Sequence, residues 1–201
     1  MRIAVINEVS ARDKNDKVIE ALSGVPGVEV FNVGMVPGDF EVELTYIHTG
    51  LMAAIALNSG AADMVVGGCG TGQGFLISAM QYPGVICGLI TEPLDAWLFS
   101  QINAGNCVSL ALNKGFGWAA DINLKYIFEK LFADPMGQGY PLHRAQSQGE
   151  SREKLHEIGA ATHKDFQEIL KNIDPALVAH VFEHRPFKEF IENYGKAEFV
   201  Y

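Results

Sequence analysis

The feature that most limits how this chain can fold is a dense cluster of glycines directly after a short apolar run. Residues 64–66 are apolar, and five glycines then occur within residues 67–74. Residues 75–80 are again mostly apolar and can continue as a helix. This pattern predicts a strand, a tight turn and a helix, with several backbone N–H groups gathered at the N-terminus of the helix.

Cys69 lies at the start of this turn and is the candidate reactive residue. Amides at a helix N-terminus favour negative charge, so they favour the thiolate form of a nearby cysteine. Glycines also let a ligand approach the backbone closely. The alternative interpretation is a small buried cysteine in a turn that only needs glycine. A nucleotide-binding turn is excluded, because no register of these glycines gives G-x-G-x-x-G and no Gly-Lys-Ser/Thr follows.

Strand-like and helix-like segments alternate along residues 1–132. Short apolar runs predict strands, and apolar residues three and four positions apart predict helices. The expected strands are 2–7, 28–33, 63–67, 84–90 and 107–112, and the expected helices are 13–22, 45–58, 75–80, 93–101 and 119–132. This alternation predicts an α/β protein with a three-layer αβα Rossmann-like fold, a five-stranded parallel sheet and additional C-terminal helices.

We expect residues 1–133 to form the α/β domain and residues 134–201 to form a loop and a helical extension. Two amphipathic helices are expected in that extension, over 150–173 and 175–194. The extension is expected to pack on the same domain or on a dimer partner. Ligands of parallel α/β sheets bind beyond the carboxyl ends of the strands. Glu8 after the first strand and Cys69 after the third are therefore candidate site residues.

Composition and charge exclude several classes of function. The formal net charge of −9 argues against nucleic acid as a partner, because phosphate binding needs clustered Lys and Arg. No segment has the length and flanks of a membrane span, and the N-terminus lacks the features of a signal peptide. The three cysteines form no C-x-x-C pair, so we expect neither a zinc site nor a disulfide framework. A cytoplasmic protein is expected.

The glycine turn carries a family resemblance. Gly-Cys-Gly-Thr-Gly-Gln-Gly at 68–74, Thr-Glu-Pro at 91–93 and Asn-Cys-Val-Ser-Leu at 106–110 resemble the type B ribose 5-phosphate isomerase and galactose 6-phosphate isomerase family. The resemblance implies an aldose–ketose isomerase that acts on a small sugar phosphate through an enediolate, with Cys69 as the base. It implies no metal and no organic cofactor. It also implies a homodimer, or a tetramer built from it.

The resemblance further implies which residues form the site. Thr71 is expected beside Cys69 as a catalytic residue, and Glu8 stands where the family has Asp. The residues expected to bind substrate are Gly70, Gly72, Gln73, Gly74, Tyr46, His48, Asn103, His143 and Arg144. His48 has two interpretations, as a substitute acid or as a histidine on a helix face. His143 and Arg144 are either the phosphate-binding stretch of the family or solvated loop residues.

Several family positions differ in this chain. Val9 and Ile102 stand where the family has histidines, and no Lys or Arg occurs between Lys17 and Lys114. Because the missing histidines assist ring opening, a substrate that is already open or shorter than ribose 5-phosphate is expected. Two alternatives stay open: a member without catalysis that serves as a carbohydrate-binding or regulatory subunit, and a cysteine-nucleophile hydrolase or transferase, which would need a histidine near Cys69.

Overall fold

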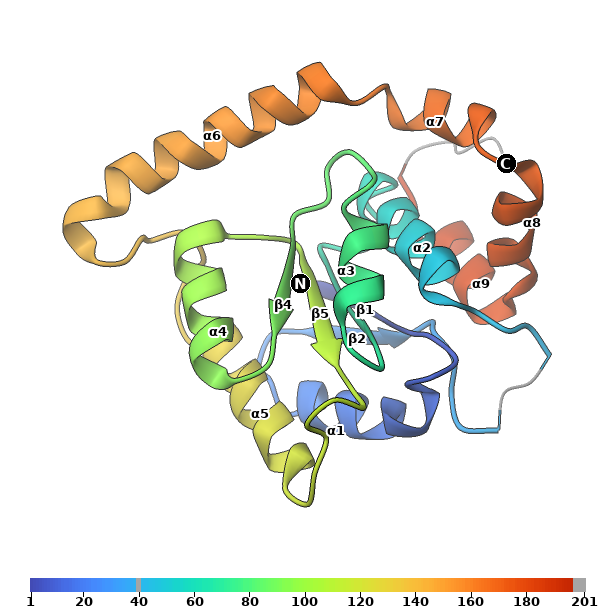
Figure 1. The fold of residues 1–201 in the computed structure, drawn as a ribbon, viewed down its shortest axis with the longest axis horizontal. Coiled ribbons are helices and arrows are strands. Elements are labelled where there is room, and N and C mark those ends of the chain that lie inside the picture. Colours follow the sequence, from blue (N-terminus) through green and yellow to red (C-terminus); the bar gives the residue numbers. More distant parts are fainter. Residues whose placement is uncertain (39–40, 197–201) are drawn as a thin grey trace.

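Five strands and the helices between them form the body of the protein in the computed structural model, which describes residues 1–38 and 41–196. The strands are β1 (Arg2–Asn7), β2 (Glu29–Asn32), β3 (Met64–Cys69), β4 (Cys87–Ile90) and β5 (Cys107–Ala111). The helices of this part are η1 (Arg12–Lys14), α1 (Asn15–Ser23), α2 (Tyr46–Asn58), α3 (Gln73–Ala79), α4 (Pro93–Leu98), η2 (Phe99–Asn103) and α5 (Ala120–Leu131). Figure 1 shows their arrangement.

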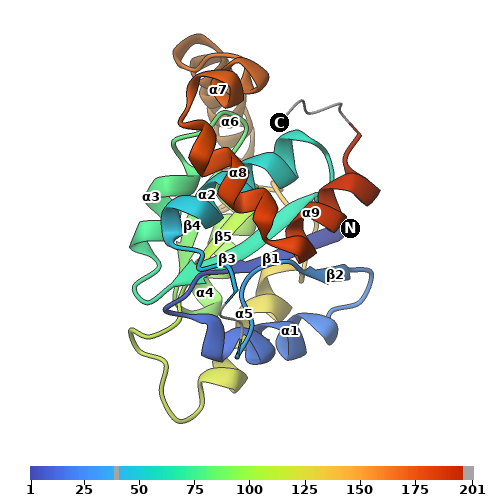
Figure 2. The ribbon, with the colours of Figure 1, turned by 90° about the vertical axis from the view of Figure 1, so that its right-hand side faces the viewer.

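The strand order is β2-β1-β3-β5-β4, and every neighbouring pair is parallel. This confirms the predicted five-stranded parallel sheet. Connections between parallel strands are right-handed, so the face on which a helix lies depends on the side to which the next strand is added. α1, α4 and α5 lie on one face of the sheet, and α2 and α3 lie on the other. Figure 2 shows the sheet between α1 and α5 on one side and α2 on the other. The three-layer αβα fold is therefore confirmed.

Alternate residues of the strands enter two separate cores. Ile3 and Val5 of β1 pack with α1, α4 and α5, whereas Ala4 and Ile6 pack with α2 and α3. All four side chains are completely buried. A sheet covered on both faces needs apolar residues along the whole strand, which explains the uninterrupted apolar runs in the sequence. Cys69 belongs to the core on the α2 and α3 side.

The helix expected over 93–101 ends early, and the chain continues as the π-helical turn η2. The ring of Phe99 packs against Gly105: a Cβ added at Gly105 would lie 2.1 Å from Cζ of Phe99. The carbonyl groups of residues 100–102 accept hydrogen bonds from the C-terminal extension. The donors are the N–H groups of Gly137 (2.9 Å) and Gly139 (2.9 Å) and Nη1 of Arg152 (2.8 Å). These bonds satisfy carbonyls that a helix end leaves open.

As far as residue 196, the C-terminal extension forms four helices and a short 3₁₀ turn, instead of the two helices expected there. They are η3 (Leu142–Arg144), α6 (Ala145–Thr162), α7 (Phe166–Asn172), α8 (Pro175–Glu183) and α9 (Arg185–Tyr194). The first expected helix is interrupted because the Asp165 carboxylate accepts the N–H of Gln167 (2.9 Å) and starts a new helix. The second is interrupted at His184 because Pro186 has no N–H to continue the helical hydrogen bonds.

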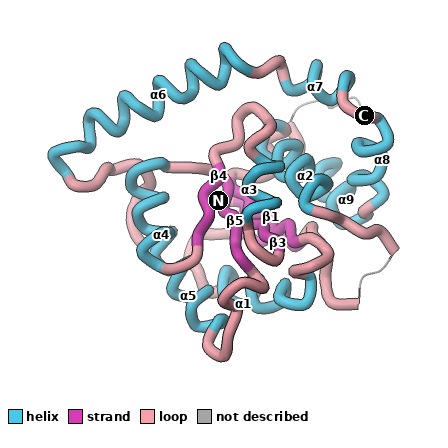
Figure 3. Tube along the Cα trace, in the orientation of Figure 1, coloured by secondary structure: helices cyan, strands magenta, loops and turns pink. Residues whose placement is uncertain are grey.

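Two parts of the extension differ in how they meet the body. α8 and α9 pack on α2 and on β2, where Phe31 lies 4.9 Å from Phe190 between ring centroids. α6 contains no buried residue; Arg152 joins its first half to η2, and Figure 3 shows the helix running along the outside of the body. Residues 197–201, at the end of the expected extension, lie outside the described residues. In the described part of the chain, no helix is long and apolar enough to cross a membrane.

Candidate active site

The carboxyl ends of β1 and β3 meet where the strand order changes direction. Asn7 of β1 is paired with Gly68 of β3. Glu8 directly follows Asn7, and Cys69 is the last residue of β3, still paired with Ala111 of β5, so this strand runs two residues beyond the expected 63–67. Ligands of open parallel sheets bind at such a switch point. The fold thus brings together the two candidate residues that the sequence places after different strands.

The turn between β3 and α3 needs glycine at two positions. Gly72 precedes α3 with φ 74° and ψ −20°, and a Cβ at this position would lie 2.5 Å from Cδ1 of Leu89. A left-handed conformation in such close contact favours glycine. A Cβ at Gly74 would lie 2.9 Å from Cγ of Tyr46. Tyr46, the first residue of α2, therefore packs directly on the turn and leaves 45% of its surface exposed beside it.

Cys69 is held firmly by its backbone, whereas its thiol has few partners. The carbonyl oxygen accepts the N–H of Leu112 (3.0 Å) and of Gly72 (3.3 Å). The side chain is only 6% exposed, and Sγ lies 4.0 Å from Oγ1 of Thr71. A hydroxyl group at this distance is a weak partner for sulfur. The thiol therefore lies at the mouth of the turn with the Thr71 hydroxyl as a weak partner.

The amides of the turn divide into engaged and open groups. Gly70 donates to Oγ of Ser10 (3.0 Å), and Gln73 donates to Oγ1 of Thr71 (3.3 Å). Gly72 donates to the carbonyl of Cys69. The N–H groups of Thr71 and Gly74 have no acceptor among residues 1–38 and 41–196. An anion at the turn would therefore be bound by the amides of Thr71 and Gly74 and by the Thr71 hydroxyl.

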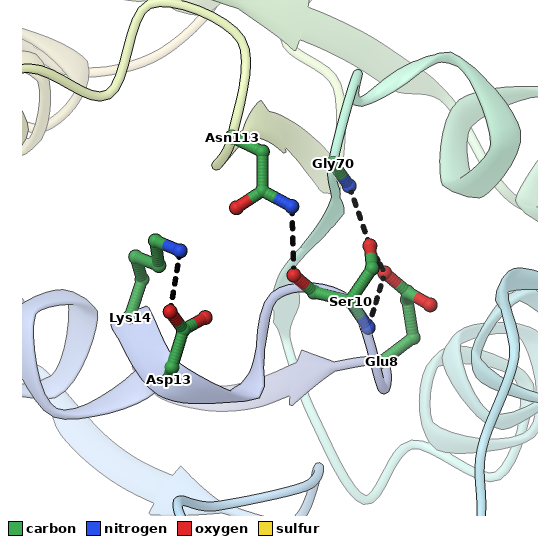
Figure 4. A network of polar contacts seen from close by, with 6 residues as sticks. All are labelled: Glu8, Ser10, Asp13, Lys14, Gly70 and Asn113. Carbon is green, nitrogen blue, oxygen red and sulfur yellow. Dashed lines mark hydrogen bonds and ion pairs between the residues drawn. The ribbon is translucent and has the colours of Figure 1, made fainter.

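Glu8 is connected to the turn through Ser10, as Figure 4 shows. The Glu8 side chain is only 4% exposed, and its Oε1 accepts both the N–H (3.1 Å) and the hydroxyl of Ser10. Ser10 Oγ in turn accepts the Gly70 N–H. Asn113, after β5, donates from Nδ2 to the Ser10 carbonyl (2.8 Å). Ser10 and Asn113 were not expected from the sequence, because only the sheet register brings them to Gly70.

His48 contacts the start of its own helix and the C-terminal extension. Its Nδ1 accepts the N–H of Thr45 (2.9 Å), which completes a capping box at the start of α2. Its ring lies 4.4 Å from the ring of His180 in α8. Burial, followed by the neighbouring His180, lowers the pKa of His48 below its ordinary value. The neutral ring therefore joins α2 to α8 in the extension.

The remaining expected residues lie further along the chain. Asn103 is exposed at the end of η2, next to the half-buried Ile102. His143 and Arg144 are exposed in η3, just before α6. In Figure 1, α6 runs along the top of the molecule, whereas β5 points toward the bottom. Lys114 is a cation nearer to the turn. Its backbone N–H donates to the Gly70 carbonyl (2.9 Å), and its side chain is exposed.

The other two cysteines have a different environment from Cys69. Cys87 and Cys107 are paired in register between β4 and β5, and both are buried free thiols. Burial, followed by contact with Cys87, raises the pKa of Cys107 well above its ordinary value. No group of three or more His, Cys, Asp or Glu side chains gathers as a metal site within the described ranges. Cys69 ends its strand beside the glycine turn, whereas Cys87 and Cys107 begin theirs at the other end of the sheet.

Comparison with known proteins identifies the family. The model of the ribose/galactose isomerase family matches residues 3–131. The chain belongs to the ribose/galactose isomerase family. Its membership confirms the resemblance carried by the glycine turn and shows that the protein is a sugar isomerase. Among curated proteins compared by sequence, none matches the chain.

Solved structures of sugar isomerases resemble this chain to different degrees. A crystal structure of a ribose-5-phosphate isomerase from Vibrio parahaemolyticus is 47% identical, with a TM-score of 0.94 over 98% of this chain and 94% of that one. A 4-deoxy-L-threo-5-hexosulose-uronate ketol-isomerase, complexed with a tartrate, is 43% identical, with a TM-score of 0.96 and the same coverage. A ribose 5-phosphate isomerase from Thermotoga maritima is 25% identical, with a TM-score of 0.57 over 74% of this chain and 97% of that one.

Proposed function

We propose that this protein is an aldose–ketose isomerase of a small anionic sugar, such as a sugar phosphate, and that it works through an enediolate with Cys69 as the base. The observation that carries the proposal is the Cys69 thiol at the start of a turn with open amides, together with the buried carboxylate of Glu8, which Ser10 connects to the same turn. Isomerisation needs a base at carbon and a site for the oxygen charge that develops. These groups supply both.

The proposed reaction moves one proton between two carbons. The Cys69 thiolate removes the proton from the carbon next to the carbonyl, and the C–H electron pair forms the double bond of the enediolate. The carbonyl oxygen takes up the negative charge, which the Thr71 hydroxyl and the open amides of Thr71 and Gly74 stabilise. Glu8 transfers the hydroxyl proton between the two substrate oxygens. The Cys69 thiol then returns its proton to the neighbouring carbon.

The other two hypotheses from the sequence have less support. A hydrolase or transferase that uses Cys69 as a nucleophile needs a base beside the thiol. His48, the only histidine in residues 1–142 of the sequence, accepts the Thr45 N–H, and its ring lies against that of His180. A binding subunit without catalysis would not need a buried carboxylate beside an available thiol. Both observations favour the isomerase.

Cations are needed to bind the anionic end of the substrate. Because no Lys or Arg occurs between Lys17 and Lys114, they must come from residues up to Lys17, from Lys114 onward or from a partner subunit. Lys114 provides one in the same chain, because its backbone is bonded to the turn. We place His143 and Arg144 of the partner subunit at the other side of the substrate, since in their own chain they lie at the opposite edge. Arg152 is occupied by the carbonyls of Ile102 and Gly137. Phosphate and carboxylate both bind charge-assisted donors of this kind.

The substrate is expected to be open, because Ile102 cannot assist ring opening. A tetrose phosphate with its terminal oxygen esterified cannot close a furanose ring. A hexosulose uronate, the substrate in the name of the 43% identical relative, is a second candidate and carries a carboxylate. We expect kcat/KM for erythrose 4-phosphate or for 4-deoxy-L-threo-5-hexosulose-uronate to exceed that for ribose 5-phosphate by about tenfold or more. Coupled assays or NMR on purified protein measure these values.

The variant Ile102→His serves as the matched comparison. It restores an acid–base group at that position, so it is expected to raise kcat/KM for ribose 5-phosphate relative to erythrose 4-phosphate. A wild-type kcat/KM for ribose 5-phosphate at least as high as for both open substrates would contradict the proposed substrate class.

We propose a homodimer in which α6 contacts the partner. Leu155 and Ile158 of α6 are 58% and 49% exposed, and a cavity of about 610 Å³ separates α6 from the segment around Tyr82 and Val85. An exposed apolar strip on a helix without buried residues marks an interaction surface. A two-fold contact would also bring His143 and Arg144 of the partner subunit toward the site.

Light scattering tests the dimer. The wild type is expected to have twice the mass of the chain over a range of concentrations, and Leu155→Glu combined with Ile158→Glu is expected to shift it to monomer, because a buried unpaired charge is costly. Ile122→Glu combined with Tyr126→Glu places the same charges on similarly exposed apolar residues of α5 and is expected to leave the mass unchanged. A monomeric wild type at all concentrations would contradict this assembly.

A further inference from the structure

Ser10 connects the catalytic turn to the buried carboxylate. Its Oγ accepts the Gly70 N–H (3.0 Å), and its hydroxyl donates to Oε1 of Glu8. A serine hydroxyl has a single proton, and the Gly70 amide already occupies Oγ as a donor. The hydroxyl proton must therefore go to Glu8. Because the Ser10 N–H bonds to the same Oε1 (3.1 Å), the second oxygen of Glu8 is the one left for substrate.

The loop that carries Ser10 is fixed from two sides. Asn7 donates from Nδ2 to Oδ1 of Asn15 (2.9 Å), which joins the two ends of the loop in the interior. Asn113 donates from Nδ2 to the Ser10 carbonyl (2.8 Å), while its own N–H donates to the Gly70 carbonyl (2.9 Å). Ser10 and Gly70 are thus held by the same residue. A hydroxyl in such a frame keeps one orientation at little entropic cost.

We propose that Ser10 is a positioning residue that orients the Glu8 carboxylate for proton transfer and keeps it aligned with the turn that begins at Cys69. The inference rests on the proposed isomerase function. Ser10 acts through Glu8 and does not contact the reacting atoms. Its own side chain is exposed, in contrast to Glu8, so a substitution there leaves the core unchanged.

Steady-state kinetics of Ser10 variants tests this role. Ser10→Ala removes one hydrogen bond to a charged group, so kcat is expected to fall roughly tenfold, with KM unchanged within about twofold. Ser10→Thr keeps the hydroxyl and is expected to restore most of kcat. Ser23→Ala, which removes a serine hydrogen bond to the Ile19 carbonyl in α1, is the matched control and is expected to behave as wild type.

A double-mutant cycle separates positioning from a merely structural effect. If Ser10 acts through Glu8, then Ser10→Ala has little further effect in a Glu8→Gln background. Amide NMR gives a readout that needs no turnover, since the Gly70 amide proton is expected to shift upfield in Ser10→Ala and to stay in place in Ser10→Thr. A wild-type kcat for Ser10→Ala, an additive cycle or an unmoved Gly70 amide would overturn the role of Ser10. A wild type without isomerase activity would instead overturn the proposed function.

Discussion

Cys69→Ala is expected to lower kcat by about a thousandfold or more while the fold stays intact, because the reaction loses its base at carbon. Cys69→Ser is expected to fail similarly, since a serine hydroxyl is far less acidic than a thiol and does not form the required anion. Removal of one sulfur from a site that is already 6% exposed costs roughly 1 to 2 kcal/mol of stability. Steady-state kinetics and thermal unfolding measure the two effects separately.

Cys87→Ala is the matched control for this result. Cys87 is also a buried free cysteine, 8% exposed, but it lies in the edge strand β4 away from the turn. The Cys87→Ala variant is expected to lose a similar amount of stability and to keep wild-type kcat. Turnover by Cys69→Ala close to that of Cys87→Ala would mean that the thiol is not the base.

Glu8→Gln is expected to lower kcat by about a hundredfold. Glutamine has the size of glutamate and its Oε1 can still accept from Ser10, so the geometry of the loop is retained. What it cannot do is take up and release a proton between the two substrate oxygens. KM should change much less than kcat, because the lost interaction belongs to the transition state.

The control for charge is Asp13→Asn. Asp13 lies in η1, shortly after Glu8 in the chain, but is exposed and paired with Lys14 at 2.5 Å (Figure 4). Its replacement removes the same negative charge without touching the turn, and kcat is expected to stay within about twofold of wild type, because exposed ion pairs contribute little. Equal losses in Glu8→Gln and Asp13→Asn would show a general electrostatic effect and contradict the role given to Glu8.

The sequence was sufficient for the parts of the fold that depend on local patterns. The apolar runs ending at Asn7 and near Cys69 are the strands β1 and β3, because a strand buried on both faces needs apolar residues at every position. The glycines after Cys69 predicted the turn because a backbone with positive φ, as at Gly72, favours glycine. These features are determined by residues that are neighbours in the chain.

Features that depend on distant contacts could not be predicted. Ser10 meets Gly70, and Asn113 meets Ser10, only because β1, β3 and β5 are adjacent in the sheet. Neither residue belongs to a local motif. The π-helical turn at 99–103 likewise depends on donors from the C-terminal extension, among them Arg152. Tertiary contacts of this kind decide the details of a site that local patterns only locate.

Deuterium exchange tests the central claim, that Cys69 removes a proton from carbon to form an enediolate. Wild-type protein, held at equilibrium with its best substrate in D₂O, is expected to replace the hydrogen on the carbon next to the carbonyl, which proton NMR follows directly. Cys87→Ala is expected to exchange at the wild-type rate, and Cys69→Ala at least about a thousandfold more slowly. Exchange by Cys69→Ala at the wild-type rate would contradict the mechanism, because the proton would then leave the carbon without the thiol.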